Sequence, residues 1–141
     1  MTAPRSVRNN NPGNIDRTAT IWQGEDRSPA AFASEKRFAV FVSAEYGFRA
    51  LARTLRTYQD KHGLNTVRGI VNRWAPPTEN NTGAYVAAVA RAVGVSPDAR
   101  IDVTKAAHAF PLVKAIAHHE SGGDFWPDEV IRAGLSLAGV N

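Results

Sequence analysis

The chain has 141 residues, of which 43% are hydrophobic, and this size and composition predict a single compact domain over residues 1–141 with its own core. It contains no cysteine, which excludes both a disulfide framework and thiolate metal ligands. Seventeen Lys and Arg against thirteen Asp and Glu give a net charge of +4, which favours a polyanionic partner. Nucleic acid, an anionic cell envelope and a role in solubility alone are all compatible with this charge.

The opening of the chain, residues 1–14, is polar and rich in Asn and Pro, without the apolar run that a secretory signal needs. No later segment is apolar over a membrane-spanning length. We therefore expect a monomeric protein that is made in the cytoplasm without a signal peptide and has no transmembrane segment.

Residues 1–42 are rich in turn-forming residues and contain two short extended candidates, Thr20–Gln23 and Arg37–Val42. The segment between these candidates reads as a polar loop with Gly, Ser and Pro. A small hairpin or irregular lobe is therefore expected at this end of the domain.

Three helices are expected in the middle of the chain. They begin after the capping residues Ser43, Thr66 and Thr82, and apolar residues recur behind each cap at helical spacing. The second helix ends at Pro76–Pro77 and the third at Gly94.

The C-terminal third is also expected to be helical. It carries a short helix near Thr104–Ala109, a helix over Phe110–His119 with Pro111 in its first turn, and a last helix over Pro127–Leu137. The predicted fold class is mainly α, with a small extended lobe near the N-terminus.

Glu120 is the candidate catalytic residue. The helix before it stops at Gly122 and Gly123, because glycine tolerates the left-handed conformation common just after a helix end. Glu120 is then held by a packed helix, and Phe125 and Trp126 can supply an apolar wall beside it. Desolvation there would raise the carboxyl pKa toward the range of a general acid at neutral pH. The alternative is a solvated residue at a helix end.

Several motifs resemble those of the lysozyme superfamily, in particular goose-type lysozymes, soluble lytic transglycosylases and bacterial glucosaminidases, in a rotated order. Those families begin with a Glu-Ser pair at a helix end, followed by an Asn-rich turn, an aromatic strand leading into a helix, and a Tyr-containing helix. The matching segments here are Glu120–Gly123, Asn10–Ile15, Phe38–Phe41 with Ser43–Gly47, and Trp74–Ala75 with Thr82–Val86. A circular permutation would leave the Glu helix at the back of the chain, and it requires Asn10 and Gly123 to lie close together.

The resemblance implies a lysozyme-like helical enzyme that needs no cofactor and no metal. Its substrate would be the glycan strand of peptidoglycan, cut at the β-1,4 link between N-acetylmuramic acid and N-acetylglucosamine. Glu120 would act as acid and then as base, and the hydroxyl of Tyr85 would reach toward it. A lytic transglycosylase is favoured over a hydrolase, which would need a further group to position water. Candidates for that group are Asp124 as a possible second acid, Asp16 and Glu45, although a loop Asp such as Asp124 more often makes a turn.

The expected substrate-binding residues lie on both sides of the permuted junction. Asn14 can offer its amide to the N-acetyl groups of the sugars, and Gly13 allows a close approach of the backbone, although the same segment can be a plain surface turn. Tryptophan side chains, including Trp22 and Trp74, can stack on sugar faces. The full expected set is Asn11, Gly13, Asn14, Ile15, Ser121 and Trp126.

Two other classes of function remain open. In the first, a zinc-dependent peptidase or amidase would bind its metal through His118, His119, Glu120 and either His108 or Asp124. The metalloprotease spacing would need a ligand at position 123, which is glycine. In the second, a non-catalytic phage structural protein would bind nucleic acid or cell wall through a basic surface, of which the helical stripe Arg49, Arg53 and Arg56 is the candidate.

The segment Arg8–Ile15 also resembles the opening of small phage-encoded structural or lysis proteins. This resemblance implies delivery by a phage or another lysis system. The protein would act on the bacterial cell wall in the periplasm after release, or as a component of the virion.

Overall fold

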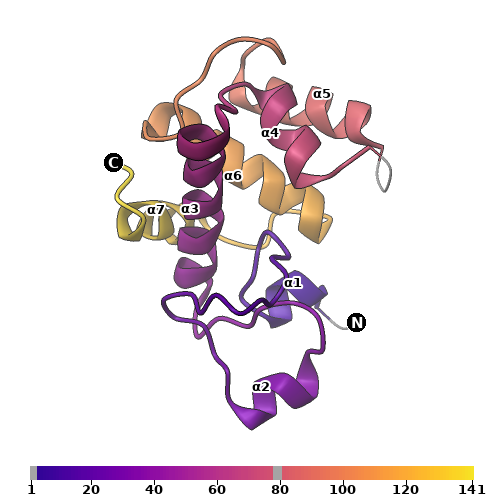
Figure 1. The fold of residues 1–141 in the computed structure, drawn as a ribbon, viewed down its shortest axis with the longest axis vertical. Coiled ribbons are helices and arrows are strands. Elements are labelled where there is room, and N and C mark those ends of the chain that lie inside the picture. Colours follow the sequence, from indigo (N-terminus) through magenta and orange to yellow (C-terminus); the bar gives the residue numbers. More distant parts are fainter. Residues whose placement is uncertain (1–2, 78–80) are drawn as a thin grey trace.

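The computed structural model describes residues 3–77 and 81–141, and this part of the chain is mainly helical, as predicted (Figure 1). It contains no sheet, and no helix in it is long and apolar enough to cross a membrane. The helices are α1 (Arg5–Arg8), α2 (Pro29–Ser34), α3 (Ala44–His62), α4 (Val67–Trp74), α5 (Thr82–Val93), α6 (Ala106–Ser121) and α7 (Asp128–Leu137).

The core forms around α3, the longest helix, which packs against α7 and α6, while α5 packs between α4 and α6 (Figure 1). Each of these helices contributes an apolar stripe at helical spacing, which is buried when the stripes meet. The largest fully buried side chains include Phe48, Leu51, Leu55, Ile70, Tyr85, Leu112, Ile116, Ile131 and Leu135.

The contact between α3 and α7 depends on Gly134. A Cβ at this position would lie 2.4 Å from Cβ of Phe48 and 2.8 Å from the main-chain oxygen of Glu45. Any side chain would therefore push the two helices apart, which explains a glycine inside a helix where its propensity is poor.

Some helix boundaries differ from the sequence prediction. Asn81 caps α5 through its side chain, and Thr82 is the first helical residue, with its hydroxyl donating to the main-chain oxygen of Ala75. The two helices expected over 104–119 are one helix, α6, which continues through Pro111. Proline removes only one ladder hydrogen bond, and the buried apolar face around it holds the helix together.

Of the two alternatives expected for the N-terminal lobe, the irregular lobe is found and the hairpin is not: the described residues of this lobe form two short helices, α1 and α2, joined by irregular segments. The extended candidates make only the isolated bridges Asp16–Phe38 and Glu25–Phe41. The segment expected as a polar loop contains α2, since the Ser28 hydroxyl accepts from the amide of Ala31 and proline occupies the first helical position. The lobe is thus organised by caps and side-chain hydrogen bonds rather than by strand pairing.

Candidate functional site

Glu120 lies in the last turn of α6, one residue before the helix ends. The helix stops at Gly122, which has a φ of +77° and would strain any residue with a side chain. Glu120 is half-buried, and the hydroxyl of Tyr85 donates to its Oε2 at 3.0 Å. Its other oxygen, Oε1, has no hydrogen-bond partner in the described part of the chain. One carboxylate oxygen is therefore held from inside the protein while the second remains available.

Tyr85 holds this carboxylate from the buried face of α5. Only 1% of its surface is exposed, and burial is the main cause that raises the pKa of Tyr85 above its ordinary value, followed by the charge of Glu120. The neighbouring Trp74 side chain acts in the opposite direction and lowers the pKa of Tyr85, but its effect is the smallest of these causes. Tyr85 therefore remains protonated and acts as the donor to Glu120.

The opening segment of the chain lies against the end of α6. Nδ2 of Asn14 donates to the main-chain oxygen of Glu120 at 3.3 Å, and the hydroxyls of Ser6 and Ser121 are 2.6 Å apart in a buried contact. Asn14 has a φ of +50°, a left-handed conformation that asparagine tolerates better than most residues. Its Oδ1 is buried without a hydrogen-bond partner among the described residues.

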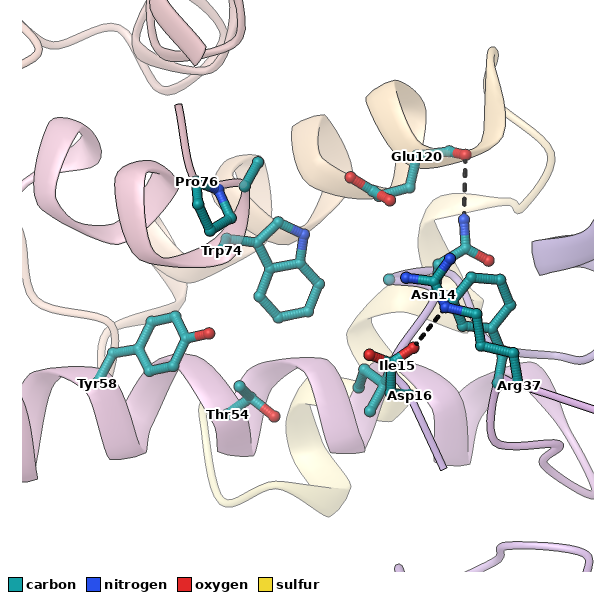
Figure 2. Close-up of a pocket in the computed structure, with 12 residues that line it drawn as sticks. Asn14, Ile15, Asp16, Arg37, Thr54, Tyr58, Trp74, Pro76 and Glu120 are labelled. Carbon is teal, nitrogen blue, oxygen red and sulfur yellow. Dashed lines mark hydrogen bonds and ion pairs between the residues drawn. The ribbon is translucent and has the colours of Figure 1, made fainter. Parts of the chain in front are cut away.

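A cleft of about 600 Å³ opens beside Glu120 (Figure 2). The rings of Tyr58 and Trp74 and the segment around Asn14 form its sides. Gly13 makes this arrangement possible, since a Cβ there would lie 2.9 Å from Cζ2 of Trp74. The residues that line the cleft are Gly13, Asn14, Ile15, Asp16, Arg37, Phe38, Thr54, Tyr58, Trp74, Ala75, Pro76 and Glu120.

Asp16 is the other carboxylate among the residues that line this cleft. Its Oδ1 accepts from Nε of Arg37 at 3.0 Å, and both side chains are largely exposed. In Figure 2 the guanidinium group of Arg37 lies between Asp16 and the end of the helix that carries Glu120. The cleft therefore presents two carboxyl groups and one guanidinium to a ligand.

Of the predicted substrate-binding residues, Gly13, Asn14 and Ile15 line the cleft, whereas Asn11 and Ser121 do not. Asn11 is fully buried, with Nδ2 donating to the main-chain oxygens of Ile15 and Ala39 and Oδ1 accepting from the amide of Ile15. Ser121 is buried against Ser6. Both side chains use their polar atoms to hold the N-terminal segment in place, so the prediction that they contact substrate was wrong.

The predictions for Trp126 and Asp124 were also wrong in placement. Trp126 packs edge-on against Phe48, with ring centroids 5.4 Å apart, and Phe125 is 46% exposed, so the apolar wall beside Glu120 comes from Trp74 and Tyr58 instead. Asp124 lies outside the cleft, where its Oδ1 is 3.0 Å from Nδ1 of His118. This pair lines a separate cavity of about 490 Å³ between α5 and α6.

The histidines do not form a metal site. Within residues 3–77 and 81–141 no group of three or more His, Cys, Asp or Glu side chains is placed to hold a metal ion. His119 stacks on the ring of Tyr85, and Nδ1 of His108 accepts from the amide of Asp102. The arginine stripe lies on α3 away from the cleft, and Arg56 pairs there with Asp60 at 2.9 Å.

Sequence reasoning did not single out Glu35, which organises the N-terminal side of the cleft. Its buried carboxylate accepts from Nε and Nη2 of Arg5 at 2.7 and 2.6 Å, from Asn9, and from the amides of Arg37 and Phe38. The guanidinium of Arg5 is the main reason that the pKa of Glu35 lies well below its ordinary value. No local pattern marks this residue, because both side chains that donate to it, Arg5 and Asn9, come from a distant part of the chain.

Comparison with known proteins finds sequence similarity to a phage protein. No protein-family model matches it. It is 35% identical over 137 residues to protein P5 of Pseudoalteromonas phage PM2, an alignment that covers 94% of this chain and 81% of the relative. At this identity and coverage the chain belongs to the family of this phage protein.

Proposed function

We propose that this member of the P5 family is a peptidoglycan-degrading glycosidase that cuts the β-1,4 link between N-acetylmuramic acid and N-acetylglucosamine. The observation that carries the proposal is the half-buried Glu120 carboxylate, which faces a cleft of about 600 Å³ and is held at Oε2 by the Tyr85 hydroxyl. Pockets that bind small ligands fall in this size range. A supported carboxyl group with one free oxygen is suited to the role of the general acid in glycosidic bond cleavage.

In this mechanism Glu120 protonates the leaving oxygen through its free Oε1. Tyr85 keeps the carboxyl group in one orientation and contributes a hydrogen bond once Glu120 has become a carboxylate. In the transglycosylase form of the reaction, Glu120 then takes the proton from the muramyl 6-hydroxyl, whose oxygen closes a 1,6-anhydro ring on the anomeric carbon. This route needs no second carboxylate.

A hydrolase would use Asp16 rather than Asp124 as its second acidic group. Asp16 lines the cleft together with Glu120, whereas Asp124 lies outside it. The rings of Trp74 and Tyr58 offer apolar surfaces to the sugar faces, and the buried Oδ1 of Asn14 is an acceptor for an acetamido N–H if the ligand shifts this side chain. The phage relative favours action during phage release or entry, because both steps must breach the cell wall.

The decisive variant is Glu120→Gln, which keeps the hydrogen bond from Tyr85 and removes the transferable proton. We expect it to fold normally and to abolish turbidity loss of purified cell walls. Asp124→Asn is the matched control, since it changes an acid that is close to Glu120 in the sequence but lies outside the cleft. Mass spectrometry of the wild-type digest then separates the two product types, because anhydro and reducing ends differ by one water. Wall lysis retained by Glu120→Gln would refute the role of this residue.

A further inference from the structure

His119, the residue before Glu120, contacts the same tyrosine. Its imidazole stacks on the ring of Tyr85 with centroids 3.6 Å apart and an angle of 21° between the planes. His119 is itself exposed, whereas Tyr85 is 1% exposed. The imidazole therefore covers one face of the phenol ring, and removing it would open that face to water.

The adjacent residues His119 and Glu120 of α6 thus contact Tyr85 at two points, its ring and its hydroxyl. Successive side chains of a helix project about 100° apart, so one tyrosine can meet both only by lying across the turn that carries them. His119 contacts the ring, and Oε2 of Glu120 receives the hydroxyl proton at 3.0 Å. The position of the ring consequently determines where the hydroxyl meets the carboxylate.

We propose that His119 is a positioning residue of the site: its imidazole holds the Tyr85 ring in place and shields the Tyr85–Glu120 hydrogen bond from water. A hydrogen bond kept away from water is stronger than a solvated one. With Oε2 held in this way, Oε1 remains directed to the cleft as the atom that carries the proton. The effect on catalysis rests on the proposed function, whereas the effect on the hydrogen bond does not.

The stacking on Tyr85 accounts for the place of the His119 side chain. It lies outside the buried core, and no hydrogen bond or ion pair of its side chain occurs among the described residues. Its neighbour His118 is also exposed, but its imidazole pairs with Asp124, whereas His119 is the histidine that stacks on Tyr85. His118→Ala is therefore a matched control, and His119→Phe retains a flat ring at the stacking position without the imidazole nitrogens.

The first measurement follows the exchange of the Tyr85 hydroxyl proton with water. In an equal mixture of H₂O and D₂O, a slowly exchanging hydroxyl gives two signals for the labelled Cζ carbon of tyrosine, and a rapidly exchanging one gives a single average. We expect two signals for Tyr85 in the wild type, in His118→Ala and in His119→Phe, and one signal in His119→Ala. Two signals in His119→Ala would overturn the proposal, whether or not the protein proves to be an enzyme.

The second measurement is the turnover of soluble glycan strands by the same four proteins. His119→Ala should lose about tenfold in kcat with little change in KM, because the acid is misplaced while the cleft is intact. His119→Phe should recover activity to within about twofold of the wild type. An unchanged kcat in His119→Ala, or a failure of the phenylalanine to restore it, would refute a positioning role. Absence of cleavage in all four proteins would refute the proposed function and leave the exchange measurement to decide on His119.

Discussion

Replacing Glu35 by glutamine tests the reasoning about how the N-terminal wall of the cleft is held. The carboxylate accepts hydrogen bonds from Arg5, Asn9 and the amides of Arg37 and Phe38. Glutamine has nearly the same shape but carries an NH₂ group, which donates and cannot accept. If the NH₂ group took the place of Oε2, it would face three donors, which are Nη2 of Arg5 and the amides of Arg37 and Phe38. We therefore expect the NH₂ group in the place of Oε1, where it faces only Nε of Arg5 and Nδ2 of Asn9.

The expected cost follows from these two contacts. A hydrogen bond to a charged group contributes about 1.5–3 kcal/mol to stability. Asn9 can turn its amide so that its oxygen accepts from the new NH₂ group, which leaves the contact with Arg5 as the main loss. The free energy of unfolding should therefore fall by about 3 kcal/mol. For a domain of this size that corresponds to a fall in melting temperature of roughly 10 °C. Denaturation by urea, followed by circular dichroism at pH 7, measures the loss directly.

The pH dependence of the unfolding free energy is a second test of the role of Glu35. The folded protein holds the pKa of Glu35 below its ordinary value, mainly through the Arg5 guanidinium, so its stabilising effect is present above the unfolded pKa of about 4.3. That stabilisation is lost as the pH falls toward the folded pKa. The difference in unfolding free energy between wild type and Glu35→Gln should therefore shrink when the pH is lowered from 7 into the acidic range.

The control is Glu129→Gln, at an exposed position in the first turn of α7, which should change stability by no more than about 0.5 kcal/mol. If Glu35→Gln unfolds at the same urea concentration as the wild type, the hydrogen bonds around Glu35 do not hold the lobe. A difference that stays constant as the pH falls would contradict the linkage argument.

Three further outcomes are expected. Tyr85→Phe should lower kcat on glycan strands by about 10- to 100-fold with little change in KM, since it removes one hydrogen bond to a charged group. An equal rise in KM would contradict the role of Tyr85 in supporting the Glu120 carboxylate. Gly134→Ala should destabilise the fold by at least about 1–3 kcal/mol in urea unfolding, because its Cβ meets α3. Gly83→Ala, where the added Cβ meets no atom of the described residues within 4 Å, should stabilise the fold by about 0.5 kcal/mol. Equal effects at both glycines would refute the packing argument. If the products have reducing ends, Asp16→Asn should slow the reaction, because the hydrolase would use this acid. If the products have anhydro ends, Asp16→Asn should leave the rate within about twofold of the wild type. Asp124→Asn should leave the rate unchanged in both cases.

The sequence by itself determined most of the helical frame. Apolar spacing and capping residues predicted α3, α4 and α7 closely, because a helix depends on residues three and four apart and on its immediate ends. The same local rules placed Glu120 at the end of a helix that stops at glycine. Local rules were weaker in the first 42 residues, where α2 takes its start from a single Ser-Pro pair and strand pairing never develops.

Only the tertiary structure decided which side chains share the cleft. Tyr85 was expected near Glu120 because of the family resemblance, but Asp16, Arg37, Thr54 and Tyr58 reach the cleft from positions far from Glu120 in the sequence. Asp124, four residues from Glu120, points elsewhere. Spacing along the chain could not tell residues that line the cleft from residues that lie outside it. The neighbours of a side chain across a cleft depend on how the helices and the N-terminal lobe pack, and contacts such as those of Glu35 and Gly134 determine that packing.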